Sequence, residues 1–365
     1  MRKREFAMCL FGAGLSVGLW ACGKSKLVAP VEAYQCQTAP QNSTFTQNEL
    51  TRAFDPVIIE RLGQANLPDA QGAQSRNQPA YFHVRFQTGI SPLADYAVAR
   101  ENLTALDQAV RATEYSFAHQ RPAGDFTLVI PSSLATQPPP TAADVTSGVA
   151  FFLASAGPAL LAFDESDWYR NAAATAACRA RVAALRPAVQ RAAAWLVQQQ
   201  STLAAYDSLA PNRLYFDAVA YYSLGRYLND EPTRQVGLRF ARRAIRAQHG
   251  RGYYQEGGGY DSSYQGVGLA LGFRLLTLLP ATEPLRADLW NSLSCGTNWQ
   301  ASRVLASGEI STQGNTRVYP GGEAFLGAEK QVSWTSTMRA CWNMYYFTGL
   351  DQYRELATRM IAHYS

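Results

Sequence analysis

Helical segments of two kinds alternate along the chain from about residue 92 to its end. One kind carries its apolar residues on a single stripe, in 94–119, 176–200, 232–248, 284–306 and the stretch from Asp351. The other kind is apolar nearly all round, in 143–162, 213–228, 262–279 and 331–348. A helix with one apolar stripe lies on the outside of a protein, whereas a helix that is apolar on all sides must be enclosed. The alternation therefore predicts helical hairpins, each with one outer and one inner helix.

Repeating hairpins of roughly 50 to 80 residues build stacked or circular arrays. Two arrays fit this pattern, an α/α toroid and an α-solenoid. Solenoid repeats leave regular sequence echoes, whereas these hairpins differ in length and content. The sequence thus predicts an all-α fold, an α/α toroid that is closed or incomplete, over residues 93–365.

Two parts of the helical pattern leave alternatives open. Pro187 either kinks the segment 176–200 or begins a new helix there. Residues 49–92 form either an extra hairpin or a cap. Within them, residues 49–63 have helical periodicity, and residues 81–87 alternate like a short strand.

The N-terminus, residues 1–22, has the pattern of a bacterial export signal. Basic residues 2–4 precede an uncharged run that is short for a membrane span. The run ends in Leu19-Trp20-Ala21-Cys22, which resembles the site where lipoproteins are cleaved and acylated on cysteine. Trp20 departs from the usual small residue, which leaves ordinary signal cleavage and a plain membrane anchor as alternatives. Residues 23–48 are polar with scattered proline, as in a tether.

This N-terminus predicts a lipid-anchored protein of the bacterial cell envelope, with a soluble periplasmic or secreted protein as the alternative. The formal net charge is +5, and the mature chain is only weakly basic. It has no Lys/Arg cluster beside exposed aromatics, which argues against a nucleic-acid partner. Four cysteines remain after the signal: Cys36, Cys178, Cys295 and Cys341. An oxidising envelope permits disulfides among them, whose pairing the sequence does not give, and buried free thiols are the interpretation we favour. Their spacing predicts no metal site, and no motif implies a cofactor.

The connections from each outer helix to the next inner helix lie on one rim of such a toroid. They are 120–142, 201–212, 249–261 and 307–330, and three of them are long. Long loops in compact domains are usually functional. The sequence therefore predicts a functional site on this rim.

The most informative of these loops is 255–266, which holds three consecutive glycines among acids, phenols, amides and hydroxyls. Glycines let a partner approach the backbone closely. Loops 249–261 and 307–330 also carry arginine, asparagine and aromatic side chains. Aromatic faces stack on sugar rings, carboxylates and amides bind hydroxyls, and arginine binds a uronate carboxylate in a bidentate manner. This mixture indicates a carbohydrate ligand.

Three stretches also resemble a known class of proteins. They are residues 120–126 at the end of an outer helix, the Tyr260-Asp261-Ser262-Ser263-Tyr264-Gln265 entry into an inner helix, and Gly314-Asn315-Thr316-Arg317. Together they resemble α/α-toroid carbohydrate-active proteins, namely heparinase II/III-like and alginate-lyase-like polysaccharide lyases and related glycosidases. The resemblance covers 93–365 by architecture and only these loops by motif.

The resemblance implies an enzyme that cleaves uronate-containing polysaccharide by β-elimination, and the N-terminus adds the envelope anchor. Tyr264 is then the first choice as base and acid, Tyr260 the second, and His249 an alternative base. Asn315, Arg317 and Arg251 would neutralise the uronate carboxylate. Further candidates for sugar binding are Tyr254, Gln265, His119 and Gln120.

Two other functions stay open. A glycoside hydrolase needs two carboxylates, for which Glu256 and Asp261 are the candidates, with Glu323 or Asp125 as further choices. A non-catalytic lipoprotein would bind glycans or act as a scaffold. Structural roles compete with each candidate: Asp261 can cap a helix, His249 can end one, and Tyr264 can pack between hairpins. An enzyme predicts that Glu256, Asp261, Tyr264 and Asn315 or Arg317 line one pocket.

Overall fold

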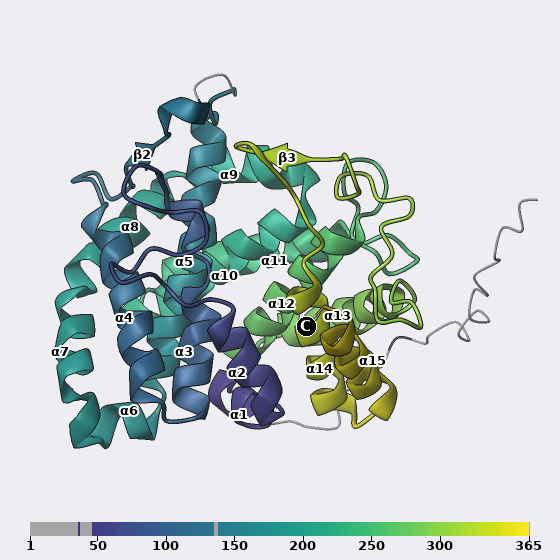
Figure 1. Cartoon of the computed structure of the whole chain (residues 1–365), viewed down its shortest axis with the longest axis horizontal. Helices are drawn as coiled ribbons and strands as arrows, with labels where there is room; N and C mark the ends of the chain where they lie inside the picture. The colour runs from purple at the N-terminus through teal and green to yellow at the C-terminus, as the bar shows by residue number, and fades with distance from the viewer. Residues whose placement is uncertain (1–35, 37–45, 135–137, 365) are drawn as a thin grey trace, which may run out of the picture. The chain divides into compact units, whose positions relative to one another are not determined.

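The computed structural model describes Cys36, residues 46–134 and residues 138–364 (Figure 1). These residues are mostly helical, and the predicted all-α toroid is confirmed. The export signal, Cys22 and nearly all of the tether lie outside the described residues. Their predicted roles in cleavage and lipid attachment therefore stay predictions.

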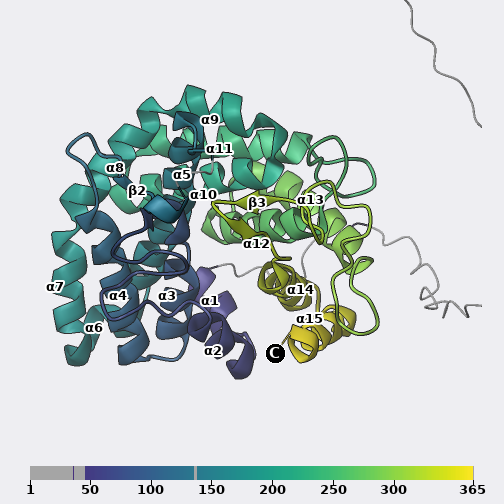
Figure 2. The same ribbon diagram turned by 45° about the horizontal axis from the view of Figure 1, so that its top comes forward.

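Inner helices that follow one another in the chain pack side by side around a common axis (Figure 2). They are α3 (Ile90–Ala99), α5 (Ala142–Asp164), α10 (Pro211–Leu228), α12 (Ser262–Leu278) and α14 (Trp334–Thr348). Two short helices, α1 (Gln47–Arg52) and α2 (Pro56–Gln64), lie between α14 and α3 in both views. There the Phe54 ring contacts Trp342 of α14. The ring of inner helices is thus incomplete, and α1 and α2 fill the interval.

The outer layer consists of amphipathic helices that cover the inner ring. They are α4 (Leu103–Ala118), α7 (Ala176–Ala184), α8 (Arg186–Gln198), α11 (Glu231–Arg246), α13 (Leu285–Ala301) and α15 (Asp351–Tyr364). Helix α11 shows the principle, since Phe240, Ala241 and Ala244 are buried while Arg239 and Arg242 face solvent. Short elements complete the fold: α6 (Asp167–Asn171), α9 (Gln200–Tyr206), β1 (Phe82–His83) paired with β2 (Leu128–Val129), and the hairpin β3 (Ala324–Phe325)–β4 (Ala328–Glu329).

Helix α5 shows why the inner helices read as apolar on every side. Thr141 caps it by accepting a hydrogen bond from the Asp144 amide, and nearly all of its side chains from Thr146 onward are buried. Among the described residues, α5 is the one helix whose length and apolar composition would allow it to cross a membrane. In this structure, however, 89 % of its most apolar stretch is buried inside the protein. Enclosure between α3, α10 and the outer layer accounts for that composition.

Three of the expected element boundaries are wrong. Residues 94–119 are not one outer helix, because the inner helix α3 ends at Ala99 and α4 begins at Leu103. Glu101, at φ 51°, makes the turn between them. The connection 201–212 is mostly helical, in α9 and a 3-10 turn. In 81–87 only Phe82–His83 forms a strand, and a 3-10 turn follows. Pro187 lies in the first turn of α8, so it begins a helix rather than kinking one.

A repeated loop joins successive outer helices at the rim. Gly124, Gly252 and Gly308 each have φ between 91° and 103°, and each packs against a backbone carbonyl of a following outer helix. Gln120 and Gln248 hold two of these loops in the same way. Gln120 Nε2 donates to a carbonyl in its loop at 3.1 Å and to a carbonyl of the next outer helix at 3.0 Å. Gln248 Nε2 makes the same two hydrogen bonds, each at 2.8 Å. Gln120, a candidate for sugar binding, is thus engaged in joining outer helices.

Substitution of Gly252 by alanine is expected to lower the unfolding free energy by about 1–3 kcal/mol. Its φ of 95° strains any Cβ, and that Cβ would lie 2.6 Å from the Cys295 carbonyl oxygen. Gly250→Ala is the matched control in the same loop, because no atom lies within 4 Å of its Cβ position. Denaturant titration of both variants checks the prediction, and equal midpoints would contradict it.

The cysteines are divided between a disulfide and free thiols. Cys36 and Cys295 form a disulfide with a Cα–Cα distance of 4.7 Å, so the expectation of free thiols is wrong for this pair. Cys178 and Cys341 are free and buried, as expected. This disulfide fastens the segment before α1 to the outer helix α13, and it joins residues that are 259 positions apart in the sequence.

Candidate functional site

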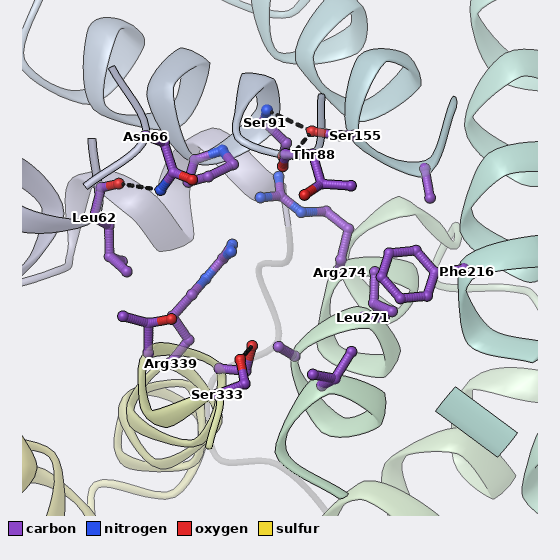
Figure 3. Close-up of a pocket in the computed structure, with 16 residues that line it drawn as sticks. Leu62, Asn66, Thr88, Ser91, Ser155, Phe216, Leu271, Arg274, Ser333 and Arg339 are labelled. Atoms are coloured by element: carbon purple, nitrogen blue, oxygen red, sulfur yellow. Dashed lines mark hydrogen bonds between the residues drawn. The ribbon is translucent and has the colours of Figure 1, made fainter. Parts of the chain in front are cut away.

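Two cavities lie in succession along the axis that the inner helices enclose. The mouth cavity, of about 350 Å³, opens near the long-loop rim. The deep cavity, of about 290 Å³, is shown in Figure 3. Helices α5, α10 and α12 line both, with residues one helical turn apart. These pairs are Phe151 and Ala154, Arg213 and Phe216, and Tyr264 and Val267. The segment before α14 also lines both, through Lys330 at the mouth and Ser333 in the deep cavity. Helices α10 and α12 begin at the mouth cavity, since Asn212, Arg213 and Tyr264 of their first turns line it.

The mouth cavity combines cations with aromatic rings. Arg76, Arg85, Arg213 and Lys330 line it, together with Phe86, Phe151, Tyr264, Phe325 and Asn212. Glu329 is the one carboxylate among the residues that line it. Guanidinium and ammonium groups bind carboxylates and sulfates, and aromatic faces stack on sugar rings. The chemistry of the lining therefore suits an acidic sugar.

The hairpin β3–β4 lines this cavity through Phe325, Ala328 and Glu329. Arg76 Nη1 donates to the carbonyl oxygens of Phe325 and Leu326, at 2.7 Å and 2.8 Å. The Phe325 ring lies 4.5 Å from the guanidinium carbon of Arg85. The hairpin thus places an aromatic ring against the cations that line the mouth.

Tyr264 and Lys330 form the centre of a hydrogen-bond network in the cavity wall. Lys330 Nζ donates to Tyr264 Oη at 2.6 Å, and Tyr264 Oη donates to Glu323 Oε2 at 2.8 Å. Lys330 Nζ also lies 2.7 Å from Glu323 Oε1. Arg317 joins Glu323, at 2.7 Å, to Glu256 on its other side. A phenol, an amine and a carboxylate are thus held in contact beside the cavity.

The environment sets the protonation of these groups. Burial raises the pKa of Tyr264 well above its usual value. The Arg317 charge opposes this rise, whereas the Glu323 charge adds to it. The phenol therefore stays protonated at neutral pH. Burial lowers the pKa of Lys330, although Glu323 opposes the shift. Burial would raise the pKa of Glu323, but hydrogen bonds from Arg317, Lys330 and Tyr264 lower it to about 2. The pair Tyr264–Lys330 is therefore a proton donor next to an amine that gives up its proton more readily than usual.

A second charged network lies on the opposite wall of the mouth. Arg85 pairs with Asp144 at 3.0 Å, and Arg213 lies 3.9 Å from Asp144 and 3.3 Å from Asp207. Asp217 lies beneath them, and neither of its carboxylate oxygens has a hydrogen-bond partner. Burial raises the pKa of Asp217 well above its usual value, and the Asp207 charge adds to the effect. Asp217 therefore holds its proton to a higher pH than a carboxyl group in water does.

The floor of the deep cavity carries more positive than negative charge. Arg274 Nη1 donates to Asp95 Oδ1 at 3.0 Å, and both side chains are buried. Arg339 extends from α14 into the cavity and reaches Asp95 at only 3.5 Å (Figure 3). Burial and the Arg274 charge lower the pKa of Arg339 to about 10. Ser91, Ser155, Ser333 and Ser336 add hydroxyls to the walls. The cavity as a whole thus favours anionic, hydroxyl-rich ligands.

Of the sequence candidates, Tyr264 lines the mouth cavity, and Glu256 and Arg317 stand directly behind it. Glu256 is only 3 % exposed, and burial raises its pKa to about 6 even though Arg317 opposes the shift.

Asp261 and Asn315 instead hold the loops together. Asp261 accepts four backbone hydrogen bonds, from Ser263, Tyr264, Arg317 and Val318. Asn315 bonds Ser262 and the Val318 carbonyl. The expectation that all these residues line one pocket is wrong.

The other candidates lie away from the cavities and pack within the rim. Tyr254 is buried against Tyr215 and Ser292, and Gln265 accepts from the Tyr254 amide. His249 stacks on Tyr253, and its Nδ1 accepts from the Arg251 amide. Tyr260 packs on Trp299 and donates to the Gln313 carbonyl. His119 stacks on Phe82, with centroids 3.9 Å apart. None of these side chains lines the mouth or the deep cavity. Asp125, a further choice, pairs with the exposed Arg121.

Sequence reasoning missed Lys330 as a central residue, and it missed Arg85, Arg213, Asp144 and Arg339 altogether. One signal pointed to Lys330. The chain has 33 basic residues, and within the described residues Lys330 is the only lysine. Arginine fills every other basic position there, yet arginine cannot release its proton in proteins. A lysine differs from arginine here because burial shifts its pKa readily. The missed arginines carried no comparable signal.

Comparisons with known proteins give little further guidance. No protein-family model and no curated protein sequence matches the chain. Among solved structures it is similar to a UGL variant with dGlcA-Glc-Rha-Glc (TM-score 0.46, 13 % identity, 83 % of this chain and 85 % of that one). It is also similar to the unsaturated glucuronyl hydrolase of Bacillus sp. GL1 that degrades glycosaminoglycan (0.44, 11 %, 83 % and 95 %). A third is the unsaturated glucuronyl hydrolase of Streptococcus agalactiae (0.36, 9 %, 88 % and 99 %). Similarities with TM-scores below 0.5 carry no conclusion about the activity of this chain.

No metal centre is evident in the described part of the chain, which contains no group of three or more His, Cys, Asp or Glu side chains placed to hold an ion.

Proposed function

We propose that this protein is a polysaccharide lyase that cleaves uronate-containing glycan by β-elimination in the mouth cavity. One observation carries the proposal: the contact of 2.6 Å between Lys330 Nζ and Tyr264 Oη, in a cavity lined by cations and aromatic rings. Elimination needs a base, an acid and a positive group beside the uronate carboxylate. The cavity wall holds a candidate for each.

In the proposed reaction the neutral Lys330 amine removes the proton next to the uronate carboxylate. The electron pair forms the new carbon–carbon double bond as the bond to the glycosidic oxygen breaks. Tyr264 gives its proton to that oxygen, and Arg85 or Arg213 stabilises the charge that develops on the carboxylate. The Lys330 ammonium then returns a proton to the Tyr264 phenolate across their hydrogen bond. Tyr264 is thus the acid. The base is Lys330 and not Tyr264, although from the sequence we expected Tyr264 to serve as both.

The position of these two groups also indicates which uronates react. Because base and acid are in contact, both approach the sugar from one face. The proton removed and the glycosidic oxygen must then lie on the same face of the ring. Glucuronate and mannuronate units have this arrangement, whereas galacturonate, guluronate and iduronate units do not. We infer a substrate that contains glucuronate or mannuronate.

A panel of uronate polysaccharides tests the proposal, with the ultraviolet absorbance of the unsaturated product as the readout. We expect the full chain to produce this signal and Tyr264→Phe to lose turnover with little loss of stability, because phenylalanine keeps the ring. A fully active Tyr264→Phe chain would remove this residue from the mechanism. Release of reducing ends without the absorbance would replace elimination by hydrolysis. Binding without either would leave a glycan-binding protein.

One observation favours hydrolysis as a second candidate. Asp144 and Asp207 both lie within 4 Å of Arg213 at the mouth, where burial raises the pKa of Asp207 although Arg213 opposes the shift. Two carboxylates in different environments are what hydrolysis needs. Asp144 is 12 % exposed, whereas Asp207 is fully buried. The expected pair, Glu256 and Asp261, is engaged with Arg317 and with backbone amides instead. Loss of reducing-end release in Asp144→Asn, with Lys330→Arg unaffected, would favour this candidate.

We further propose that Cys22 attaches the protein to the cell envelope through a lipid. The basic residues, short apolar run and cysteine of the N-terminus support this location, and a disulfide between Cys36 and Cys295 is compatible with an oxidising compartment. The mass of the mature N-terminal peptide tests it, since an unacylated peptide that begins elsewhere than at Cys22 would exclude the anchor.

A further inference from the structure

A third cavity lies on the outside of the ring, next to the mouth. This flank groove, of about 610 Å³, runs between the loop before β3, the segment after β4 and the end of α15. Ile310, Val318 and Val332 form apolar parts of its lining, and Tyr319, Trp334 and Tyr364 add aromatic rings. It is larger than either axial cavity, and none of the functions discussed so far uses it.

The aromatic wall of the flank groove is formed before any ligand binds. Trp334 and Tyr364 stack in parallel, with centroids 5.3 Å apart and planes at 8°. Tyr364 Oη accepts a hydrogen bond of 3.0 Å from the Ile310 amide, which ties the end of α15 to the loop. Tyr319 is 44 % exposed and free to contact a ligand. A rigid aromatic wall lowers the ordering cost of binding.

The charges of the flank groove differ from those of the mouth. Glu309, Glu329 and His363 line it, and Lys330 is the one lysine or arginine that does so. The Lys330 ammonium is bonded to Tyr264 and Glu323 on the cavity side. Carboxylates beside aromatic rings accept hydrogen bonds from sugar hydroxyls and repel a uronate. The groove therefore suits a neutral sugar, whereas the mouth suits an acidic one.

The two sites are contiguous, because Glu329 and Lys330 line both of them. We propose that the flank groove binds a neutral sugar unit of the same chain whose acidic unit occupies the mouth cavity. The substrate then alternates acidic and neutral units. This inference rests on the proposed function, since it assumes an acidic sugar in the mouth.

Calorimetric titration tests the inference on the Tyr264→Phe chain, which does not consume the probes. The probes are a disaccharide and a tetrasaccharide of alternating glucuronate and N-acetylglucosamine, and a tetrasaccharide of mannuronate alone. We expect the alternating tetrasaccharide to bind about tenfold more tightly than the disaccharide, a difference of about 1.4 kcal/mol. The affinity of the mannuronate tetrasaccharide should exceed that of the disaccharide by a much smaller factor.

Tyr319→Ala should remove the gain of the alternating tetrasaccharide and leave disaccharide binding unchanged. Leu67→Ala is the matched control, because Leu67 is similarly exposed at 46 % and lies outside the groove. An equal gain for the mannuronate tetrasaccharide would overturn the preference for a neutral unit. A gain that survives Tyr319→Ala, or no gain at all, would overturn the groove as a sugar site while the mouth still binds. Failure of every acidic probe to bind would overturn this inference and the proposed function together.

Discussion

Lys330→Arg is expected to lower kcat by about 10² to 10⁴-fold, the usual contribution of a general base. Arginine keeps the positive charge beside Tyr264 and Glu323 and can retain the ion pair, so the fold and KM should change little. It cannot lose its proton, however, and so cannot remove a proton from the sugar. Steady-state kinetics with the polysaccharide that gives the strongest signal, together with a denaturation curve, measures both effects.

The pH profile of the wild-type chain provides an independent readout of the same residue. The rate should rise as pH rises through the pKa of Lys330, which burial lowers, because the amine must be neutral. It should fall only when Tyr264 ionises, at a pH well above the usual value for a phenol. The optimum is therefore alkaline. Arg242→Lys on the exposed face of α11 is the control for an exchange between arginine and lysine. Wild-type turnover in Lys330→Arg would exclude Lys330 as the base.

Asp217→Asn is expected to change the pH dependence of stability more than any other single substitution in the core. The raised pKa of Asp217 means that the folded protein keeps a proton that the unfolded chain releases above about pH 4. Stability is therefore fully present below that pH and falls as pH rises toward the folded pKa. The slope is about 1.4 kcal/mol per pH unit for this one group. Asparagine does not titrate, so the variant should lose this part of the slope.

Denaturant unfolding between about pH 5 and pH 8 measures the effect of Asp217→Asn. Asp167→Asn serves as the control, because the Asp167 side chain is 83 % exposed and its only ion pair, with Arg170, is at the surface. An unchanged slope in Asp217→Asn would mean that Asp217 is ionised in the folded protein.

The alternation of enclosed and one-sided helices could be predicted from sequence because burial on all sides leaves no room for polar residues. Helices α5, α10 and α12 therefore matched the expected positions closely. Helix α3 was missed for a physical reason. It has only ten residues, and the turn to α4 uses Glu101 in a left-handed conformation rather than glycine or proline. The one local signal is Asn102, which caps α4 by accepting a hydrogen bond from the Ala105 amide.

The site could be predicted less well than the fold. The rim and Tyr264 were identified, but most of the polar residues in the glycine-rich loop serve the loop itself. Asp261 and Asn315 satisfy backbone groups that a tight, buried loop cannot expose to water. Sequence shows which residues can bind a sugar, but not which way they point. Arg85 and Arg213 reach the mouth from segments far from the glycine-rich loop, and no local pattern connects them to Tyr264.

The position of two helix N-termini has a kinetic consequence. Each helix N-terminus carries a partial positive charge, and those of α10 and α12 adjoin an opening already lined by arginine and lysine. An acidic polymer would be attracted from beyond contact distance, and its association would be faster than that of a neutral chain of equal length. Added salt should slow this capture steeply, because the Debye length shrinks to about 8 Å at physiological ionic strength and further above it.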